Sequence, residues 1–530
     1  MNSTVDAEPA TNSPAPRVRL IFGALLLVLL LASLDQTIVS TALPTIVGDL
    51  GGLKHLSWVV TAYLLASTVV SPLYGKLGDL YGRKRVLQVA IVVFLVGSAL
   101  CGAAQTMLQL IAFRALQGLG GGGLMVTTLA TVGDIVPLRE RGRYQGLFGG
   151  VFGVSTVVGP LLGGFFVDNL SWRWIFYINL PIGLVALCII GAAFTVPPLT
   201  GRRHRIDWLG TVVLGTGLAA VVLFTSLGGT TFAWTATPMI TLLASGIVLL
   251  TLFPFVESRA ADPIVPLELF RSRSFTVSSA IGFVVGFALF GSVTFLPLYL
   301  QVVKGYSPTR SGLLLTPLMA GVLTTSITSG NLITKFGRYR PFPIAGTAIA
   351  TLGLYLLSRL EMNTPIRVAS LFMLILGLGL GLVMQVLVLT AQNAAPYRLL
   401  GVATSTSTMA RQIGGTIGVA VFGAIFSNRL GHELARVVPP RAHIPTNVNP
   451  ELVRHLPPAL HDAYVAAVAS ALHPVFLAAA GVMLVGFALS WLLEDAPLRT
   501  TAGAETAAEP TRGRSQARDG SPVAAAGSKL

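Results

Sequence analysis

The sequence predicts an all-α membrane protein with fourteen transmembrane helices, and three observations lead to this prediction. Of the 530 residues, 53% are hydrophobic and only 11% are charged, whereas a soluble globular protein carries about 25% charged residues. The apolar residues gather in runs of about 20, the length that a helix needs to cross a bilayer. The basic residues fall in small groups between these runs. Despite a formal net charge of +15, this pattern excludes a soluble enzyme and a nucleic-acid-binding protein.

The apolar runs follow one another along the whole chain. They lie near residues 19–42, 56–75, 86–104, 107–133, 145–167, 175–196, 208–227, 238–256, 277–300, 311–330, 342–358, 368–390, 403–427 and 472–493. The first run is too long, and with Asp35, Gln36 and Thr37 too polar at its end, to be a cleaved signal peptide. We therefore expect it to remain as a span.

The orientation follows from the basic residues in the connections. An inside N-terminus places 24 Lys and Arg in cytoplasmic segments and ten in outer loops, with Arg114 and Arg411 inside spans. Positively charged loops are retained in the cytoplasm. We therefore expect a multi-pass protein of the cell (inner or plasma) membrane with both termini in the cytoplasm.

Two inner loops have related sequences 255 residues apart. Residues 75–85 read GKLGDLYGRKR and residues 330–340 read GNLITKFGRYR, so that Thr334 replaces Asp79. Two parallel halves related by an axis along the membrane normal are a transporter architecture, with substrate bound between the halves. Two halves of six helices leave two additional central helices over.

These features divide the chain into five parts. We predict a disordered N-terminus at 1–16, an N-terminal six-helix half at 17–200, two inserted helices at 201–260, a C-terminal six-helix half at 261–496 and a disordered cytoplasmic tail at 497–530. A long outer loop at 428–471 contains Pro439, Pro440, Pro457 and Pro458, followed by an amphipathic stretch through Tyr464. A helix lying on the membrane surface is the simpler interpretation of that stretch, and a gate for substrate is the alternative.

Several motifs resemble those of a known transporter family. Residues 75–85 are similar to the loop signature of the major facilitator superfamily. LDQTIVSTALP from Leu34, RALQGLGGG from Arg114, GPLLGG from Gly159 and WRWIFYINLPIG from Trp172 resemble its fourteen-span drug:proton antiporter branch, the EmrB/QacA type. The resemblance implies the major facilitator fold and export of drugs in exchange for protons.

Asp35 is the acidic residue that lies well inside a predicted span, and an ionisable group at that depth costs at least a few kcal/mol. At 1.5 Å per residue, Asp35 lies about 10 Å and Arg114 about 12 Å below the outer ends of their spans. If the two helices adjoin, the pair can neutralise itself, and protonation of Asp35 would release Arg114. We expect Asp35 to couple proton entry to substrate exit with Arg114 tuning its proton affinity, as the resemblance also implies. A static ion pair between two helices is the alternative.

The resemblance also implies a group of interacting residues at the first inner loop. Asp79, Arg83 and Asp134, with Gly75 and Gly82 in the same loop, would form a latch that breaks and re-forms between conformational states. The alternative is topology alone, with the basic residues as inside-positive charge and Asp79 capping a helix. Thr334 speaks against the same network in the second half.

Small and polar residues inside spans supply the remaining candidates. Close helix packing and a kink are possible at Gly159, Pro160, Gly163 and Gly164. The resemblance implies that this stretch is an antiporter hinge or a seal against proton leak. The candidates for lining a substrate cavity are Gln36, Tyr63, Gln117, Asn179, Gln385, Arg411 and Gln412. Each alone is more often a helix-to-helix hydrogen bond. Arg411 has no acidic partner in the sequence pattern and could bind an anionic group, bond to carbonyls or snorkel to the membrane surface.

The sequence contains no phosphate-binding loop, no metal-ligand spacing and no nucleophile with a base, and Cys101 and Cys188 both lie in apolar runs. We therefore expect no enzyme and no cofactor, with the proton gradient as energy source. The expected function is proton-coupled export of hydrophobic or amphipathic drug-like compounds by a protein that works as a monomer in the bilayer, without nucleic acid. The alternatives are a dedicated exporter of a cellular product (a lipid, a siderophore or a self-made antibiotic) and a membrane sensor that does not transport.

Overall fold

A computed structural model describes residues 16–50, 56–136, 138–194, 207–228, 232–437 and 457–495. The predicted disordered segments at 1–16 and 497–530 lie outside this part, apart from Pro16. The first half contains α1 (Pro16–Leu50), α2 (Leu56–Tyr81), α3 (Arg83–Ala103), α4 (Met107–Ile135), α5 (Leu138–Asn169), α6 (Trp174–Tyr177) and α7 (Asn179–Ala193). The inserted helices are α8 (Trp208–Leu227) and α9 (Thr237–Glu257).

The second half begins with the short helix η2 (Leu267–Arg271). It continues with α10 (Arg273–Val293), α11 (Leu296–Leu298), η3 (Tyr299–Val303), α12 (Pro308–Leu314), α13 (Thr316–Phe336), α14 (Pro341–Leu357), α15 (Ile366–Ala394), η4 (Tyr397–Leu399), α16 (Leu400–Val437) and α18 (Pro458–Ser490). The described residues form no strand beyond one isolated bridge between Gly228 and Phe232. The predicted all-α class is confirmed.

Eleven helical stretches within the described ranges are long and apolar enough to cross a membrane. α4, α5 and α14 run beside them, α4 against α2 and α3, α5 against α1 and α13, and α14 against α15 and α18. Together they match the fourteen predicted spans in chain order. Many large apolar side chains on the outer faces are exposed, such as Val89, Leu184, Ile247 and Val485. Exposed apolar side chains are compatible with the hydrocarbon core of a bilayer, so these faces are suited to contact lipid.

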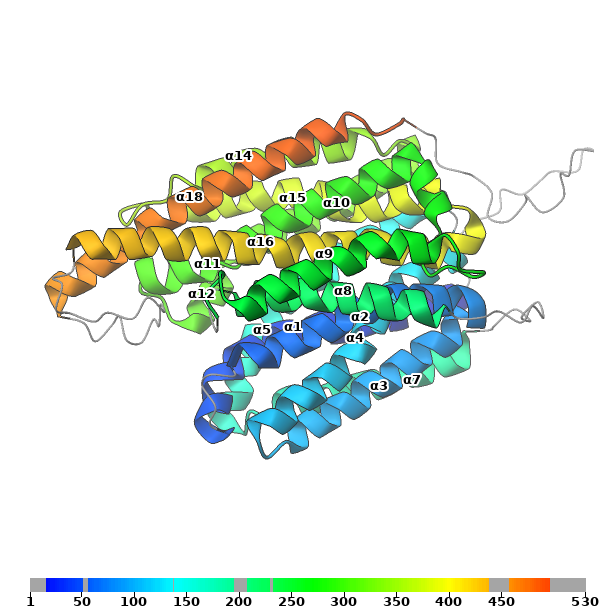
Figure 1. Cartoon of the computed structure of the whole chain (residues 1–530), viewed down its shortest axis with the longest axis horizontal. Coiled ribbons are helices and arrows are strands. Elements are labelled where there is room, and N and C mark those ends of the chain that lie inside the picture. Colours follow the sequence, from blue (N-terminus) through cyan, green and yellow to red (C-terminus); the bar gives the residue numbers. More distant parts are fainter. Residues whose placement is uncertain are drawn as a thin grey trace, which may run out of the picture.

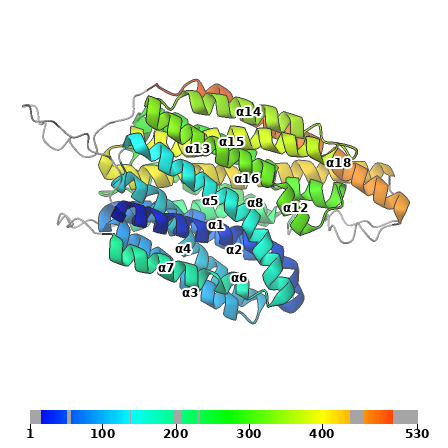
Figure 2. The same cartoon turned by 180° about the vertical axis from the view of Figure 1, so that it is seen from behind.

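The two halves lie side by side, with the inserted helices across their junction (Figure 1). α8 packs against both α2 and α16, and α9 packs against α8. One apolar cluster joins Val69 of α2, Leu218 of α8 and Ile413 of α16. The inserted pair therefore covers the seam between α2 and α16. The second seam, between α5 and α13, lies on the opposite side of the molecule (Figure 2).

The internal repeat is visible in the backbone. Gly82 and Gly337, which are 255 residues apart, adopt φ of 86° and 71°. Glycine reaches this left-handed region without steric cost, unlike residues with a Cβ atom. The aromatic-Gly-Arg turn is therefore the same element in both halves.

The predicted outer loop at 428–471 is helical at both ends. α16 continues to Val437 and α18 begins at Pro458, while residues 438–456 lie outside the described part. Tyr464 is 2% exposed and belongs to the core of the second half with Leu434. The expectation of a surface helix is therefore wrong for this stretch. Its alanines are too weakly apolar to extend a hydropathy pattern, yet alanine favours helix more than any other residue.

The halves meet at the end of the bundle that carries the 75–85 loop. Gly75 of α2 lies against Ser405 of α16, and Gly146 of α5 lies against the Ser326 backbone of α13. Gln392 Nε2 of α15 donates to the Leu129 carbonyl of α4 at 3.4 Å. We call this the loop end of the bundle. The structure is therefore a conformation in which the two halves are in contact at the loop end.

Candidate functional site

Asp35 lies on α1 at the centre of a buried polar network. Its side chain is inaccessible to solvent, and Arg114 of α4 is only 1% exposed. Arg114 Nη1 donates to Asp35 Oδ2 at 2.7 Å. The sequence places Asp35 and Arg114 at similar depth in their spans. In the structure they form an ion pair, although they are 79 positions apart in the chain.

Two amide side chains complete the hydrogen bonds of the carboxylate. Gln117 Nε2 of α4 donates to Asp35 Oδ1 at 2.8 Å, and Asn179 Nδ2 of α7 donates to the same oxygen at 3.0 Å. Both amides also donate to Ser98 Oγ of α3, at 3.1 and 2.9 Å. The donors to Asp35 thus come from α4 and α7, and Ser98 of α3 accepts from both amides.

Arg114 is held from several directions. Its Nε donates to the Val59 carbonyl at 3.2 Å, and its Nη1 also donates to Gln117 Oε1 at 2.7 Å. The Tyr63 ring lies under the guanidinium at 4.4 Å. This arrangement requires close approach of α2 and α4, because a Cβ atom at Gly118 would overlap the Tyr63 carbonyl.

The network brings two buried, opposite charges together. Three donors satisfy the carboxylate, and its charge compensates the buried guanidinium. Removing one partner of a buried ion pair leaves an uncompensated charge at a cost of about 3–5 kcal/mol. Loss of either charge would therefore leave the other one buried without its partner.

Three residues predicted to line a cavity belong to this network. Gln117 and Asn179 are wholly buried and bond to Asp35, and Tyr63 is 1% exposed beneath Arg114. The helix register turns these three residues toward Asp35 and Arg114, and their place in a substrate cavity stays a prediction. Ser98, which the sequence reasoning missed, had no signal to separate it from any other serine in a span.

The predicted latch residues do come together at the loop end. Arg83 Nη2 donates to Asp79 Oδ1 at 2.8 Å, and Arg83 Nε donates to Asp134 Oδ2 at 2.5 Å. Asp79 also accepts the backbone N–H groups of Gly401 and Val402, at 3.1 and 3.0 Å.

Those two N–H groups are in the first turn of α16, so Asp79 caps that helix across the junction of the two halves. A carboxylate there is favoured by the partial positive charge of the helix N-terminus. Gly75 allows the approach, because a Cβ atom there would lie 2.7 Å from Ser405 Cβ and 2.8 Å from the Gly401 carbonyl oxygen. The sequence indicated Asp79 as a helix cap but gave no sign that α16 is the helix.

The equivalent loop of the second half differs as its sequence predicts. Thr334 Oγ1 donates to the Gly330 carbonyl of its own helix at 2.9 Å. Arg338, at the position of Arg83, is 72% exposed and lies 3.9 Å from Asp495. The capping of a helix in the opposite half therefore rests on Asp79.

Gly159 of the predicted hinge lies in the continuous helix α5 against α1. A Cβ atom there would lie 2.7 Å from Thr37 Cβ. Next to it, Thr37 Oγ1 donates to the Ser155 carbonyl at 2.9 Å, and the Ser33 and Ser155 hydroxyls share a hydrogen bond of 2.8 Å. Pro160, Gly163 and Gly164 lie in the same helix, and the role of the stretch as a hinge stays a prediction.

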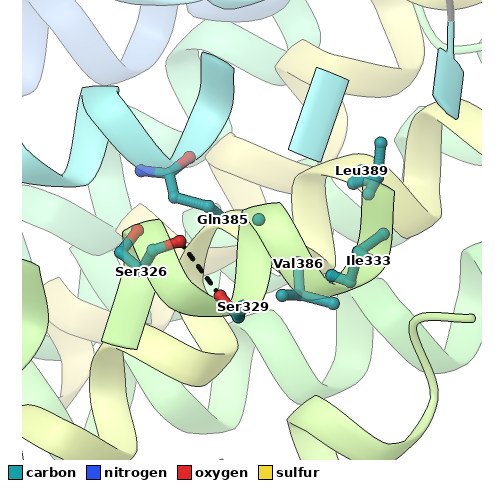
Figure 3. A pocket seen from close by; sticks show the side chains of 7 residues that line it. Ser326, Ser329, Ile333, Gln385, Val386 and Leu389 are labelled. Atoms are coloured by element: carbon teal, nitrogen blue, oxygen red, sulfur yellow. Dashed lines mark hydrogen bonds between the residues drawn. The ribbon is translucent and has the colours of Figure 1, made fainter. Parts of the chain in front are cut away.

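Of the remaining cavity candidates, Gln36 follows Asp35 on α1, and the other three lie on α15 and α16. Gln385 of α15 is 8% exposed and borders Ser326 of α13 and Gly149 of α5 (Figure 3). Within the described ranges, Gln385 Oε1 and Ser326 Oγ have no hydrogen-bond partner. Gln36 is exposed, whereas Arg411 and Gln412 on α16 are half-buried. Among the described residues, no group of His, Cys, Asp and Glu could hold a metal ion.

Comparisons with known proteins agree with this architecture. Residues 25–419 match the family model of the Major Facilitator Superfamily. The chain is 46% identical over 488 residues to the uncharacterized MFS-type transporter Rv1877 of Mycobacterium tuberculosis, covering 92% of this chain and 71% of that protein. It is 41% identical over 421 residues to the multidrug transporter protein MdtP of Bacillus subtilis, covering 79% and 77%.

A solved structure extends the agreement to the fold. The proton:xylose symporter XylE superposes with a TM-score of 0.61 at 14% identity, covering 92% of this chain and 98% of that one. Such low identity shows the fold alone. From the family match and the helical architecture together, the chain is a multi-pass membrane protein that belongs to the major facilitator superfamily, a family of transporters and not of enzymes.

Proposed function

We propose that this transporter is a proton-coupled antiporter that exports hydrophobic or amphipathic compounds by alternating access. The names of relatives support export, since the protein with 41% identity is called a multidrug transporter. A second relative from Bacillus subtilis, 37% identical over 424 residues, is called multidrug resistance protein 3. The Asp35 network supports proton coupling, and it is the single observation that carries the proposal.

The proposed proton step is an exchange of partners at Asp35. The carboxylate accepts bonds from Arg114, Gln117 and Asn179, which lie on α4 and α7. A proton on Asp35 cancels the charge that compensates Arg114, so the guanidinium must move to other acceptors or to water. Protonation therefore weakens the ties of α1 to α4 and α7, and loss of the proton restores them.

The loop end supplies the proposed conformational step. Asp79 holds the first turn of α16 while Arg83 holds both Asp79 and Asp134. Opening the bundle at this end breaks the capping bonds, and closing it re-forms them. A two-state contact of this kind, biased by the protonation of Asp35, couples proton movement to alternating access.

The cargo is proposed to reach the protein from the membrane or its surface. A groove of about 490 Å³ between α1, α5 and α13 is lined by glycine, leucine and valine, among them Leu26, Val154 and Leu323. Such a lining suits apolar molecules. By the positive-inside rule the loop end is proposed to face the cytoplasm, in a cell membrane, with a single chain as the transporting unit.

Uphill transport in proteoliposomes tests the proposal. The full-length protein and an Asp35→Asn variant are compared with neutral, cationic and anionic fluorescent dyes under an imposed pH gradient. The control variant Asp462→Asn makes the same exchange at an exposed position of α18. We expect gradient-driven accumulation by the wild type and the control and none by Asp35→Asn. Full uphill transport by Asp35→Asn would refute proton coupling through this residue.

A further inference from the structure

Arg411 is a cation in a membrane-spanning helix with no counter-charge. It lies in α16, and its side chain is half-buried. Within the described residues, no acidic group lies in ion-pair range of its guanidinium and no hydrogen bond satisfies it. The other arginine at membrane depth, Arg114, is bonded to Asp35, Gln117 and Val59.

The side chain of Arg411 points into the protein. Met409 and Ile413, two residues before and after it, pack against α8, so at 100° per residue Arg411 lies on the opposite face. On that face the Arg411 backbone and Cγ contact α10 at Gly286. Thr404, two turns earlier on the same face, bonds to Gln392 of α15, which in turn bonds to α4. Arg411 therefore faces the region where the two halves meet.

Of the three roles open to such an arginine, two fail on geometry. It makes no bond to a backbone carbonyl among the described residues. It lies eleven residues, or about 16 Å, inside the Leu400 end of α16. Its distance from the Val437 end is greater still. Its side chain faces the protein and does not extend toward the membrane surface as a snorkelling arginine does, so binding of an anionic group remains.

Neighbouring polar groups are also unsatisfied. Thr408, one turn before Arg411, is 1% exposed and its Oγ1 has no partner, and Gln412 Oε1 has none within the described part either. The Thr408 hydroxyl can donate to the same anion that the guanidinium binds. Phe283 and Phe287 of α10 pack on the same side of α16, where their backbones touch Gly414 and Gly418. Arg411 thus lies on the face of α16 that packs against the phenylalanine-rich helix α10.

We propose that Arg411 and Thr408 form an anion subsite that binds the acidic group of an amphipathic cargo, most simply a carboxylate on a hydrophobic body. The guanidinium offers two parallel donors, which match the two oxygens of a carboxylate. The inference rests on the proposed export function and narrows its cargo to compounds with an acidic group. An inorganic anion such as chloride has the same charge, and the experiment separates the two sources.

Equilibrium binding of matched probes tests the subsite. Purified full-length protein is titrated with dansylglycine, dansylleucine and dansylphenylalanine and with the primary amide of each, and dansyl fluorescence is read at constant ionic strength. We expect the wild type to bind at least one acid about tenfold or more tightly than its amide, as a charge-assisted bond implies. Arg411→Gln removes this preference without changing the affinity for the amide. Arg411→Lys keeps part of it, because the charge remains and the fork is lost.

The control variant removes an arginine of α16 outside the proposed subsite. Arg429→Gln removes an arginine that pairs with Glu433 on the same helix and leaves the preference intact. Equal affinity for acid and amide in all three pairs overturns the proposal, as does an equal loss of both in Arg411→Gln. If chloride in place of gluconate abolishes the preference, the site holds an inorganic ion and the proposal also fails. The binding assay uses no pH gradient, so its outcome is independent of proton coupling. If the binding test fails while gradient-driven export persists in Arg411→Gln, the anion subsite is refuted and proton coupling through Asp35 is not.

Discussion

Replacing Asp79 with Asn is expected to open the loop end of the bundle. Asn keeps one acceptor oxygen but loses the charge and the second acceptor, so it cannot hold both Gly401 and Val402 as Asp79 does. A hydrogen bond to a charged group contributes about 1.5–3 kcal/mol, and a carboxylate at a helix N-terminus contributes about 0.3–1 kcal/mol. Because Arg83 retains Asp134, we take the net loss as about 2–3 kcal/mol, which shifts the equilibrium toward the open state by about 30- to 150-fold.

Single-molecule energy transfer across the loop end measures this shift. Dyes are placed on cysteines at Glu140 of α5 and Lys335 of α13, which are exposed and belong to different halves. The exposed Cys188 is replaced by Ser, and Cys101 is buried. Asp495→Asn is the matched control, because it removes an exposed ion pair with Arg338 within the second half. A closed population in Asp79→Asn that equals the wild type within a factor of two would refute the role of Asp79 as a latch.

Three further changes probe the same account. Gly118→Ala places a methyl group where the Tyr63 carbonyl lies, so we expect about 1–3 kcal/mol lower stability. A thermal unfolding midpoint equal to that of wild type would contradict it. Gln117→Leu removes a bond to Asp35 and one to Arg114, and uphill dye transport should fall while the protein still folds; unchanged transport would show that the amide is dispensable. Arg83→Lys keeps the charge but loses the fork that joins two carboxylates, and the energy-transfer assay should show a smaller opening than Asp79→Asn.

The fold and the ion pair followed from the sequence for physical reasons that a single chain displays. The spans could be predicted from hydropathy, because a helix that crosses a bilayer must be predominantly apolar. The pairing of Asp35 with Arg114 could be predicted from their similar depth in the membrane. Charged residues are rare at that depth, and they usually pair with one another. The repeat of the aromatic-Gly-Arg turn predicted Gly82 and Gly337 as equivalent positions, and both adopt positive φ.

Other parts of the site depend on packing that no short stretch of sequence records. Asp79 binds backbone N–H groups of Gly401 and Val402, more than 320 residues away, and backbone donors leave no side-chain signal. Gln117 and Asn179 were candidates for a cavity because each is a polar residue in a predicted span. The rotation of α4 and α7 against α1 turns them toward Asp35.

The position of Arg411 became interpretable only with its neighbours. In the sequence it was an arginine in a span with three possible roles. The contacts of α8 and α10 decide which way it faces, and both are tertiary contacts. α8 is also one of the inserted helices, whose place over the seam of α2 and α16 could not be read from the chain.

The measurement that tests the central claim most directly compares two modes of transport in Asp35→Asn. Asn resembles the protonated carboxyl in size and charge, so the account predicts that this variant still exchanges labelled for unlabelled dye across proteoliposomes at equal pH. It also predicts that the variant no longer drives dye uphill under a pH gradient, whereas the wild type does both. Retained uphill transport would contradict proton coupling at Asp35. Loss of both modes with a lowered unfolding midpoint would show that Asp35 and Arg114 are a static pair that holds the helices together.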